Sequence, residues 1–306
     1  YSGRKLKKCY RVYIMKHIVG LFSFLSLVIN MLIWCSMLLI LGVIRLAIPL
    51  NAWRKFITRI TIIVGESCIY CNGLWISFLL RPKWTVEGLE NLDIRKWYLA
   101  TSNHQSWGDI FVLQFITNKR MPLLRFFMKD VLKWIPIVSI VGWSMNMPFL
   151  KRYSKEKLKR KPELRGHDID KMKKSFKKLS TYPSTVFSFA EGTRYSKKKH
   201  KKLNSNFRGL LNPKLGGIAM SIATMPYIKT LVDFTIKYSS NNRSFWDFLC
   251  GRMSEASIKV RVQDIPKEFY ERDFSLEKEY REDLKEWLFE IWGKKEAFMR
   301  KEDFIN

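Results

Sequence analysis

The sequence predicts an α/β fold, in which helices cover a mixed sheet and an N-terminal membrane-embedded helical anchor precedes it. A long apolar run lies near the N-terminus, and after residue 80 shorter apolar runs of strand and helix length alternate. No proline- or glycine-rich linker interrupts residues 80–265. We therefore expect three parts: an anchor with an interfacial helix over residues 1–80, an α/β domain over 81–265, and an amphipathic helical tail over 266–306.

The first apolar run is long enough to cross a bilayer. From Ile18 to Ile44 no ionisable side chain occurs apart from the thiol of Cys35. At about 1.5 Å per residue, this run exceeds the roughly 30 Å of a hydrocarbon core. Asn30 divides it into halves that are too short to span separately. A signal peptide is the competing interpretation, but the run is too long and lacks an Ala-x-Ala-like exit.

Basic residues flank this run on both sides, so the positive-inside tendency places both of its ends in the cytoplasm. This favours a re-entrant or membrane-embedded hairpin over a single span. A second apolar stretch covers residues 60–80 and has Glu66 as its only charge. The alternatives for it are a second membrane segment, an interfacial helix and a helix packed on the first run, and we favour the last two. The chain begins with Tyr1, which is compatible with a missing start.

Beyond residue 80, apolar patterns indicate the order of the elements. Residues 97–100 are typical of a short buried strand, and residues 108–116 open an apolar run of helical length. The expected order is strands near Thr85 and Leu99, a helix over 109–118, strands near Leu124 and Phe149, a basic helix at about 166–180, a strand over 185–189, a helix over 215–224, and strands over 232–237 and 258–262. A C-terminal helix that packs on the domain follows from apolar residues at helical spacing, namely Leu276, Tyr280, Leu284, Trp287, Leu288 and Ile291.

His104 and Asp109 are the first candidate catalytic residues. Five residues along a regular helix correspond to about 500°, so the two side chains would point to different faces if both were helical. We therefore place His104 at the exit of a strand and Asp109 in the first turn of the next helix, with Ser106 as the N-cap. The carboxylate then turns back to one ring nitrogen and leaves the other for a substrate hydroxyl. For Asp109 alone, the alternative is a capping box with Ser106.

A second group of candidate residues follows the strand expected over 185–189. Glu191, Gly192, Thr193 and Arg194 form a tight loop there. Glycine lets the backbone approach a ligand, threonine supplies a hydroxyl, and arginine offers a planar fork of donors that matches phosphate oxygens. Alone this loop is only a polar turn, but a base and an anion clamp at two strand ends together form a site.

The His-x4-Asp pair and the Phe-x-Glu-Gly-Thr-Arg loop resemble motifs of the glycerolipid acyltransferases, typified by lysophosphatidic acid acyltransferase. The resemblance covers most of residues 80–265, and residues 147–152 resemble the family's second block. Residues 211–217 and 231–238 resemble the branch that contains lysocardiolipin acyltransferases and related bacterial membrane enzymes. One departure supports this branch: Asp233 stands where many members have the proline of a Val-Pro-Val block.

The resemblance implies a role for each candidate residue. His104 would be the general base and Asp109 would orient it, while Arg152 and the loop of Glu191, Gly192, Thr193 and Arg194 would shape the site of the acceptor's phosphate. The implied chemistry is direct attack of a glycerol hydroxyl on a thioester carbonyl, without an acyl-enzyme. Residues 129–136 resemble the family segment near an apolar groove that holds the acyl chain.

The implied function is that of a membrane-bound O-acyltransferase. It would move a fatty acyl group from acyl-CoA or acyl carrier protein, as co-substrate, to a lysophospholipid, most simply 1-acyl-sn-glycerol 3-phosphate. No further cofactor and no metal are expected. The expected place is the bacterial inner membrane, with the catalytic domain facing the cytoplasm. The alternatives are the same chemistry on lysophosphatidylglycerol or lysocardiolipin, and a non-catalytic basic membrane protein that binds anionic lipid or RNA.

The net charge of +28 bears on the partners. Residues 151–178 contain 13 Lys or Arg against 4 Asp or Glu, and five further lysines lie within residues 197–202. Such clusters attract anionic membrane lipid and also nucleic acid, and a solvated face accounts for part of them. The apolar N-terminus favours lipid, and no zinc-finger, helix-turn-helix or RNA-recognition signature favours nucleic acid.

Several other classes of protein find no support. The five cysteines do not form an extracellular disulfide framework, and the Cys68-x-x-Cys71 pair lies in an apolar stretch without a second pair. Metalloprotease, dinucleotide and Walker motifs are absent from the sequence, as is the Gly-x-Ser-x-Gly nucleophile elbow of serine hydrolases.

Overall fold

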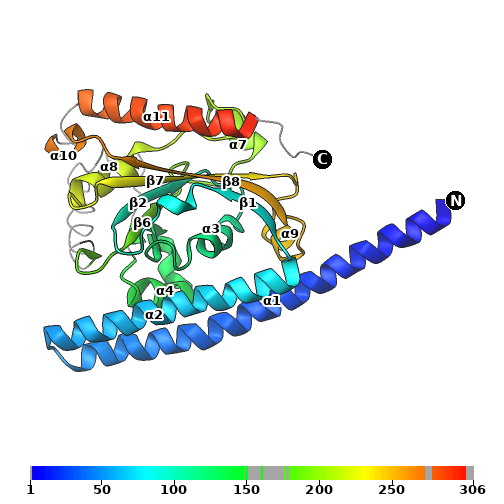
Figure 1. The fold of residues 1–306 in the computed structure, drawn as a ribbon, viewed down its shortest axis with the longest axis horizontal. Helices are drawn as coiled ribbons and strands as arrows, with labels where there is room; N and C mark the ends of the chain where they lie inside the picture. Colours follow the sequence, from blue (N-terminus) through cyan, green and yellow to red (C-terminus); the bar gives the residue numbers. More distant parts are fainter. Residues whose placement is uncertain are drawn as a thin grey trace.

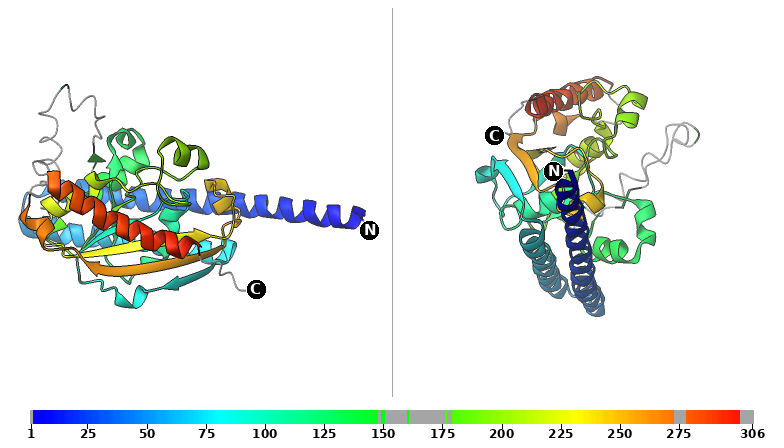
Figure 2. Two further views of the ribbon diagram at one scale, coloured as in Figure 1. Left: turned by 90° about the horizontal axis from the view of Figure 1, so that it is seen from above. Right: turned by 90° about the vertical axis from the view of Figure 1, so that its right-hand side faces the viewer.

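The computed structural model describes residues 2–147, 149–150, 160, 176, 179–272 and 278–300. A two-helix hairpin lies along one side of an α/β sandwich (Figure 1). The sandwich has three layers, because helices cover both faces of a six-stranded sheet (Figure 2).

The hairpin consists of α1 (Ser2–Ala47) and α2 (Asn51–Trp75), which continues into a π-helical turn, η1 (Ile76–Leu80). Both helices are long and apolar enough to cross a membrane, judged by length and composition. The hairpin expected within the first apolar run is wrong, since α1 continues through Asn30 and the chain turns back only between α1 and α2. The Asn30 amide donates to Asn72 Oδ1 at 2.9 Å and to the Cys68 carbonyl at 3.1 Å. A paired polar group therefore fixes the two helices against each other instead of breaking the first one.

The sheet is mixed, as expected. Its strand order is β1-β8-β7-β2-β6-β3. Strands β7, β2, β6 and β3 run parallel, β8 is antiparallel to β7, and β1 is parallel to β8. The bounds are β1 (Lys83–Glu87), β2 (Tyr98–Ser102), β3 (Leu124–Phe126), β6 (Thr185–Ser188), β7 (Thr230–Tyr238) and β8 (Glu255–Asp264).

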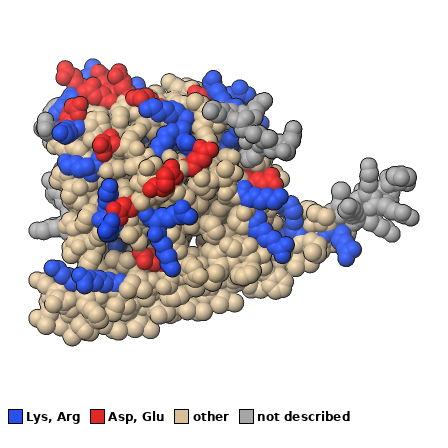
Figure 3. Space-filling model, in the orientation of Figure 1, with Lys and Arg blue, Asp and Glu red and all other residues tan. Residues whose placement is uncertain are grey.

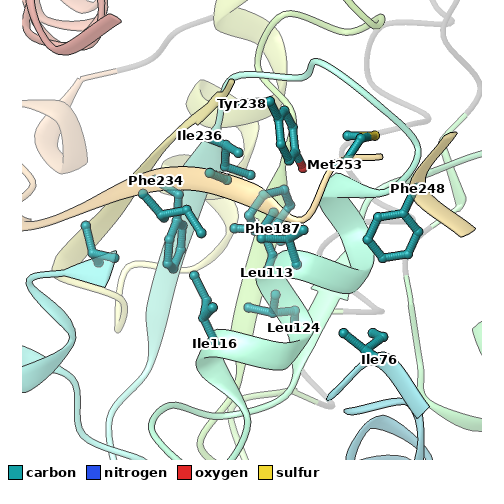
Figure 4. Packing of buried hydrophobic residues seen from close by; sticks show 14 of the residues in the cluster. Ile76, Leu113, Ile116, Leu124, Phe187, Phe234, Ile236, Tyr238, Phe248 and Met253 are labelled. Carbon is teal, nitrogen blue, oxygen red and sulfur yellow. The ribbon is translucent and has the colours of Figure 1, made fainter. Parts of the chain in front are cut away.

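Each face of the sheet buries its own apolar core. Between the sheet and the hairpin, α3 (Asp109–Thr117) contributes Leu113 and Ile116 to a core that includes Phe187 and Phe234 (Figure 4). On the opposite face, α8 (Leu215–Thr224) and α11 (Lys278–Arg300) cover the second core. The amphipathic C-terminal helix expected from the sequence is thus confirmed as a packing element, although Leu276 lies outside the described residues.

Two short helices join the domain to α1, and the sequence did not predict them. They are α4 (Pro136–Ser144) and α9 (Phe245–Leu249). On α4, Ser144 Oγ donates to the Leu38 carbonyl at 2.9 Å, and on α9 Trp246 Nε1 donates to His17 Nδ1 at 3.1 Å. The domain therefore lies along α1 from His17 to Leu38.

The remaining small elements complete the chain. The strand expected near Phe149 is not part of the main sheet: it pairs with β4 in a separate two-stranded sheet. The basic helix expected at about 166–180 lies almost wholly outside the described residues. These small elements are η2 (Leu89–Asn91), β4 (Met128–Lys129), η3 (Asp130–Trp134), β5 (Phe149–Leu150), α7 (Lys197–Lys202) and α10 (Glu268–Glu271).

Candidate active site

Three neighbouring parallel strands bring the candidate residues to one edge of the sheet. β7, β2 and β6 are adjacent, and the carboxyl ends of parallel strands meet at the same edge, where α/β proteins bind their ligands. His104 follows the end of β2, Glu191 follows the end of β6, and Tyr238 is the last residue of β7. The topology thus explains why residues far apart in sequence meet.

The histidine and the aspartate form the pair that their spacing predicts. His104 Nδ1 lies 2.9 Å from Asp109 Oδ2. The histidine side chain is 9% exposed and the aspartate is fully buried. Because Nδ1 is engaged with the carboxylate, Nε2 is the ring nitrogen that is left to receive a proton.

The loop between the two residues differs from the sequence expectation, because Ser106 is not the N-cap of the helix. The N-cap of α3 is Gly108, and Ser106 Oγ accepts a hydrogen bond from Gly108 N at 3.1 Å. The Asp109 carboxylate instead holds the loop, since its Oδ2 accepts from the backbone amides of Gln105 at 2.7 Å and Ser106 at 2.9 Å. Glycine is required at position 108 because a Cβ there would lie 2.8 Å from the ring of Phe248.

A tyrosine that the sequence reasoning did not single out completes the environment of Asp109. Tyr238 donates its hydroxyl to Asp109 Oδ1 at 2.8 Å. Burial, followed by the charge of Asp109, holds the pKa of this phenol well above its usual value. The hydroxyl therefore stays protonated and acts as a donor. The signal in the sequence was a hydroxyl at the end of the strand expected over 232–237.

Aromatic rings and a strand fix the histidine from the other side. The His104 ring stacks on Phe189, with centroids 3.9 Å apart and planes inclined by 14°, and meets the Trp107 ring edge-on at 6.3 Å. The preceding residue, Asn103, exchanges two hydrogen bonds with the backbone of Ile236 on β7, at 2.9 and 2.8 Å. The imidazole is thus held in orientation before any substrate binds.

The loop after β6 lies against the histidine loop, as the sequence predicts. Tyr195 N donates to the His104 carbonyl at 2.7 Å, and the Arg194 guanidinium lies over the Trp107 ring at 5.2 Å. Gly192 adopts a φ of 72°, in the region that favours glycine. Lys199 on α7 donates to Thr193 Oγ1 at 2.7 Å and adds a second cation beside the loop.

Glu191 differs from its neighbours because it is completely buried. Burial is the largest cause that raises the pKa of its carboxyl, to about 8, so the group is mainly protonated at neutral pH. The adjacent Ala190 carbonyl accepts from Lys214 N at 2.7 Å, which joins this loop to residues 203–214. Glu191 therefore lies in the buried wall behind the site, whereas the partly exposed Arg194 lies at the opening of the site.

Two further polar residues were missed by sequence reasoning. Arg243, between β7 and α9, donates to Gln105 Oε1, and Gln105 Nε2 donates to the Gly209 carbonyl at 3.1 Å. Burial is the first cause that lowers the pKa of Arg243, while the charge of Asp109 raises it. The guanidinium thus adds positive charge close to the histidine–aspartate pair. No local motif marks it, because it comes from a separate loop.

The structure brings together His104, Asp109 and residues 191–194, but Arg152 lies outside the described residues. Within the described part of the chain, no group of three or more His, Cys, Asp or Glu side chains is arranged to hold a metal ion. What the arrangement offers is a proton acceptor beside several anion-binding donors.

Comparisons with known proteins agree with this geometry. A 1-acyl-sn-glycerol-3-phosphate acyltransferase epsilon from Mus musculus is 25% identical in an alignment 233 residues long, which covers 66% of this chain and 56% of the mouse protein. The match therefore spans little more than half the length of that relative. The crystal structure of the 1-acyl-sn-glycerophosphate (LPA) acyltransferase PlsC from Thermotoga maritima superposes with a TM-score of 0.56, covering 94% of this chain and 98% of that one. At 14% identity this likeness concerns the fold.

The family itself is established by the sequence. The profile of the family described as Acyltransferase matches residues 83–236, about half of the chain. These residues run from β1 to the last part of β7 and contain His104, Asp109 and the loop after β6. The chain belongs to the acyltransferase family.

Proposed function

We propose that this protein is a membrane-bound O-acyltransferase that moves a fatty acyl group from acyl-CoA or acyl carrier protein to a lysophospholipid, most simply 1-acyl-sn-glycerol 3-phosphate. The observation that carries the proposal is the buried His104–Asp109 pair at 2.9 Å, with Arg194 at the mouth of the same site. The match to the mouse relative supports this acceptor.

His104 takes the proton from the acceptor hydroxyl as the hydroxyl oxygen attacks the thioester carbonyl. The carbon–sulfur bond then breaks, and the imidazolium returns the proton to the leaving thiolate. Asp109 stabilises the imidazolium and fixes the ring. Proton transfer of this kind contributes about 10²- to 10⁴-fold. Holding the two substrates together supplies a further share of the acceleration.

Arg194 and Thr193 bind the phosphate of the acceptor in this proposal. A guanidinium presents paired donors that match two phosphate oxygens. Its place over the Trp107 ring, 5.2 Å from the centroid, limits its movement and keeps the fork near the histidine. Lys199 and Arg243 add positive charge from two other elements, which favours a doubly charged headgroup over a neutral one.

The hairpin anchors the protein to a membrane, which we take to be the bacterial inner membrane with the catalytic domain facing the cytoplasm. The visible face of the hairpin carries few charged atoms, while Lys and Arg side chains gather on the sandwich beside it (Figure 3). The contacts from His17 to Leu38 lay α1 along the domain. A helix that crossed the bilayer upright would pull this flank of the domain into the hydrocarbon core. We therefore propose that the hairpin inserts from one side.

A related acceptor remains as a second candidate. Asp233 takes the place of a proline of the family pattern, as in the branch that includes lysocardiolipin acyltransferases. The same chemistry on lysophosphatidylglycerol or lysocardiolipin would use the same base and the same phosphate clamp.

One experiment tests the proposal. The purified protein in vesicles is given a panel of lyso-acceptors with labelled acyl-CoA or acyl carrier protein, and the products are identified by mass spectrometry. We expect transfer to a phosphate-bearing acceptor and its loss in His104→Ala, which still binds vesicles. His17→Gln is the matched control, because it changes a histidine at the α1–α9 contact. Undiminished transfer by His104→Ala would remove the base, and an inactive wild-type protein would favour the non-catalytic alternative.

A further inference from the structure

A completely buried lysine lies on the face of the sheet opposite the hairpin. None of the Lys295 side chain is exposed, and its ammonium group pairs with Asp233, which is equally buried on β7. The same ammonium donates to the Phe234 carbonyl at 2.6 Å. Burying a charge is costly unless it is paired and hydrogen-bonded, so both partners are needed to keep it there.

This ion pair is part of a wider contact between α11 and the strands. Arg261 on β8 places a guanidinium nitrogen 3.6 Å from Asp233 Oδ2. The same guanidinium donates to the Lys294 carbonyl on α11 at 3.2 Å. The last turns of α11 are therefore fixed to β7, the strand that ends at Tyr238 and so holds Asp109.

The next residue of α11 holds a second part of the site wall. Glu296 accepts from the Arg208 backbone amide at 2.7 Å. One residue further on, the Gly209 carbonyl accepts from Gln105 Nε2 at 3.1 Å, and Gln105 is the neighbour of the histidine. Consecutive residues of one helix thus hold two parts of the site, namely β7, which ends at Tyr238, and the loop that contacts Gln105.

We propose that α11 is a positioning element of the acceptor site, in which Lys295, paired with Asp233, fixes β7 behind the His104–Asp109 pair and Glu296 holds the loop beside Gln105. This inference rests on the proposed function. It gives the C-terminal helix a role in substrate binding, although no part of the helix needs to touch the substrate.

The test separates positioning from mere support of the fold. Lys295→Met leaves the buried Asp233 with only the more distant Arg261 as a charged partner and destabilises the protein, so the decisive variant is the double change Lys295→Met with Asp233→Val. Replacing a buried ion pair by apolar residues of similar volume is often neutral for stability. We expect the double variant to regain the wild-type melting temperature while its acceptor KM stays raised about tenfold or more, since small misplacements in a site are costly. The KM of the acyl donor stays unchanged.

Two further variants complete the design. Lys294→Met changes the neighbouring, half-exposed lysine of α11 and leaves both KM values unchanged. Glu296→Ala removes the acceptor for the Arg208 backbone amide and also raises the acceptor KM. This variant tests the inference if the double variant does not fold.

The inference is overturned if the double variant regains a wild-type acceptor KM or if the donor KM rises equally. A normal acceptor KM in Glu296→Ala would also overturn it. A wild-type protein that transfers no acyl group would refute the proposed function instead, so the two failures are distinguishable.

Discussion

Replacing Asp109 by asparagine would separate the charge of this carboxylate from its geometry. Asp109 Oδ2 accepts from the backbone amides of Gln105 and Ser106, besides facing His104 Nδ1. Because these two donors require an acceptor, the asparagine places its carbonyl oxygen there and its amino group toward Tyr238, whose hydroxyl can accept as well as donate. The imidazole then keeps the same tautomer.

The expected fall in kcat of Asp109→Asn therefore reflects only the loss of the negative charge that stabilises the imidazolium. Hydrogen bonds to charged groups contribute about 1.5–3 kcal/mol and neutral ones about 0.5–1.5 kcal/mol. The difference of about 1–2 kcal/mol corresponds to a fall in kcat of about five- to thirtyfold. Removal of the base in His104→Ala costs about 10²- to 10⁴-fold.

The assay follows the release of the free CoA thiol from vesicle-bound enzyme at saturating concentrations of both substrates. Wild type, Asp109→Asn and His104→Ala are compared at equal vesicle-bound protein. Asp264→Asn, at the end of β8, controls for the loss of one negative charge elsewhere. An Asp109→Asn enzyme as slow as His104→Ala would refute the reasoning that backbone amides select the orientation of the new side chain.

Three other predictions follow from the site. Arg194→Ala raises the KM of the acceptor far more than that of the donor, because the guanidinium supplies the phosphate fork; equal effects in a two-substrate titration would contradict this. Gly108→Ala destabilises the protein by about 1–3 kcal/mol, since its Cβ would lie 2.8 Å from the ring of Phe248, and an unchanged thermal unfolding curve would be evidence against it. Glu191 has a folded-state pKa of about 8 against an ordinary 4.5, so the folded state binds this proton more tightly and stability falls as pH rises from about 5 to about 8. Glu191→Gln removes that slope, which melting temperatures across this range can check, and an equal slope in both proteins would contradict the prediction.

Much of the sheet could be predicted because its central strands are buried on both faces. β2 is buried at all five positions, and its first three residues, Tyr98, Leu99 and Ala100, form the short apolar run that predicts it. α9 was missed because its five residues are too few to show a helical period, and α4 because its nine residues are apolar on nearly every side. Both depend on packing against α1, which no local pattern records.

The candidate site likewise contains residues that local sequence predicts and residues that only the strand order brings there. His104 and Asp109 lie on either side of one strand–helix junction, so local geometry dictates that they meet. Tyr238 and Arg243 reach the same place from another strand and its following loop, and their partners are decided by the order of strands. Ser106 shows the limit of local rules, since a capping pattern was present but the helix begins only at Asp109, whose carboxylate accepts from the amides of Gln105 and Ser106 in the preceding loop.

The register of β7 has a consequence for how this family member can change in length. Asp233 and Tyr238 are five positions apart, so they project from opposite faces of one strand, toward α11 and toward Asp109 respectively. Inserting or deleting one residue between them would turn one of the two to the wrong face, whichever way the strand shifted. Insertions and deletions should therefore be tolerated in the connections on either side of β7, whereas β7 itself should tolerate substitutions but neither insertions nor deletions.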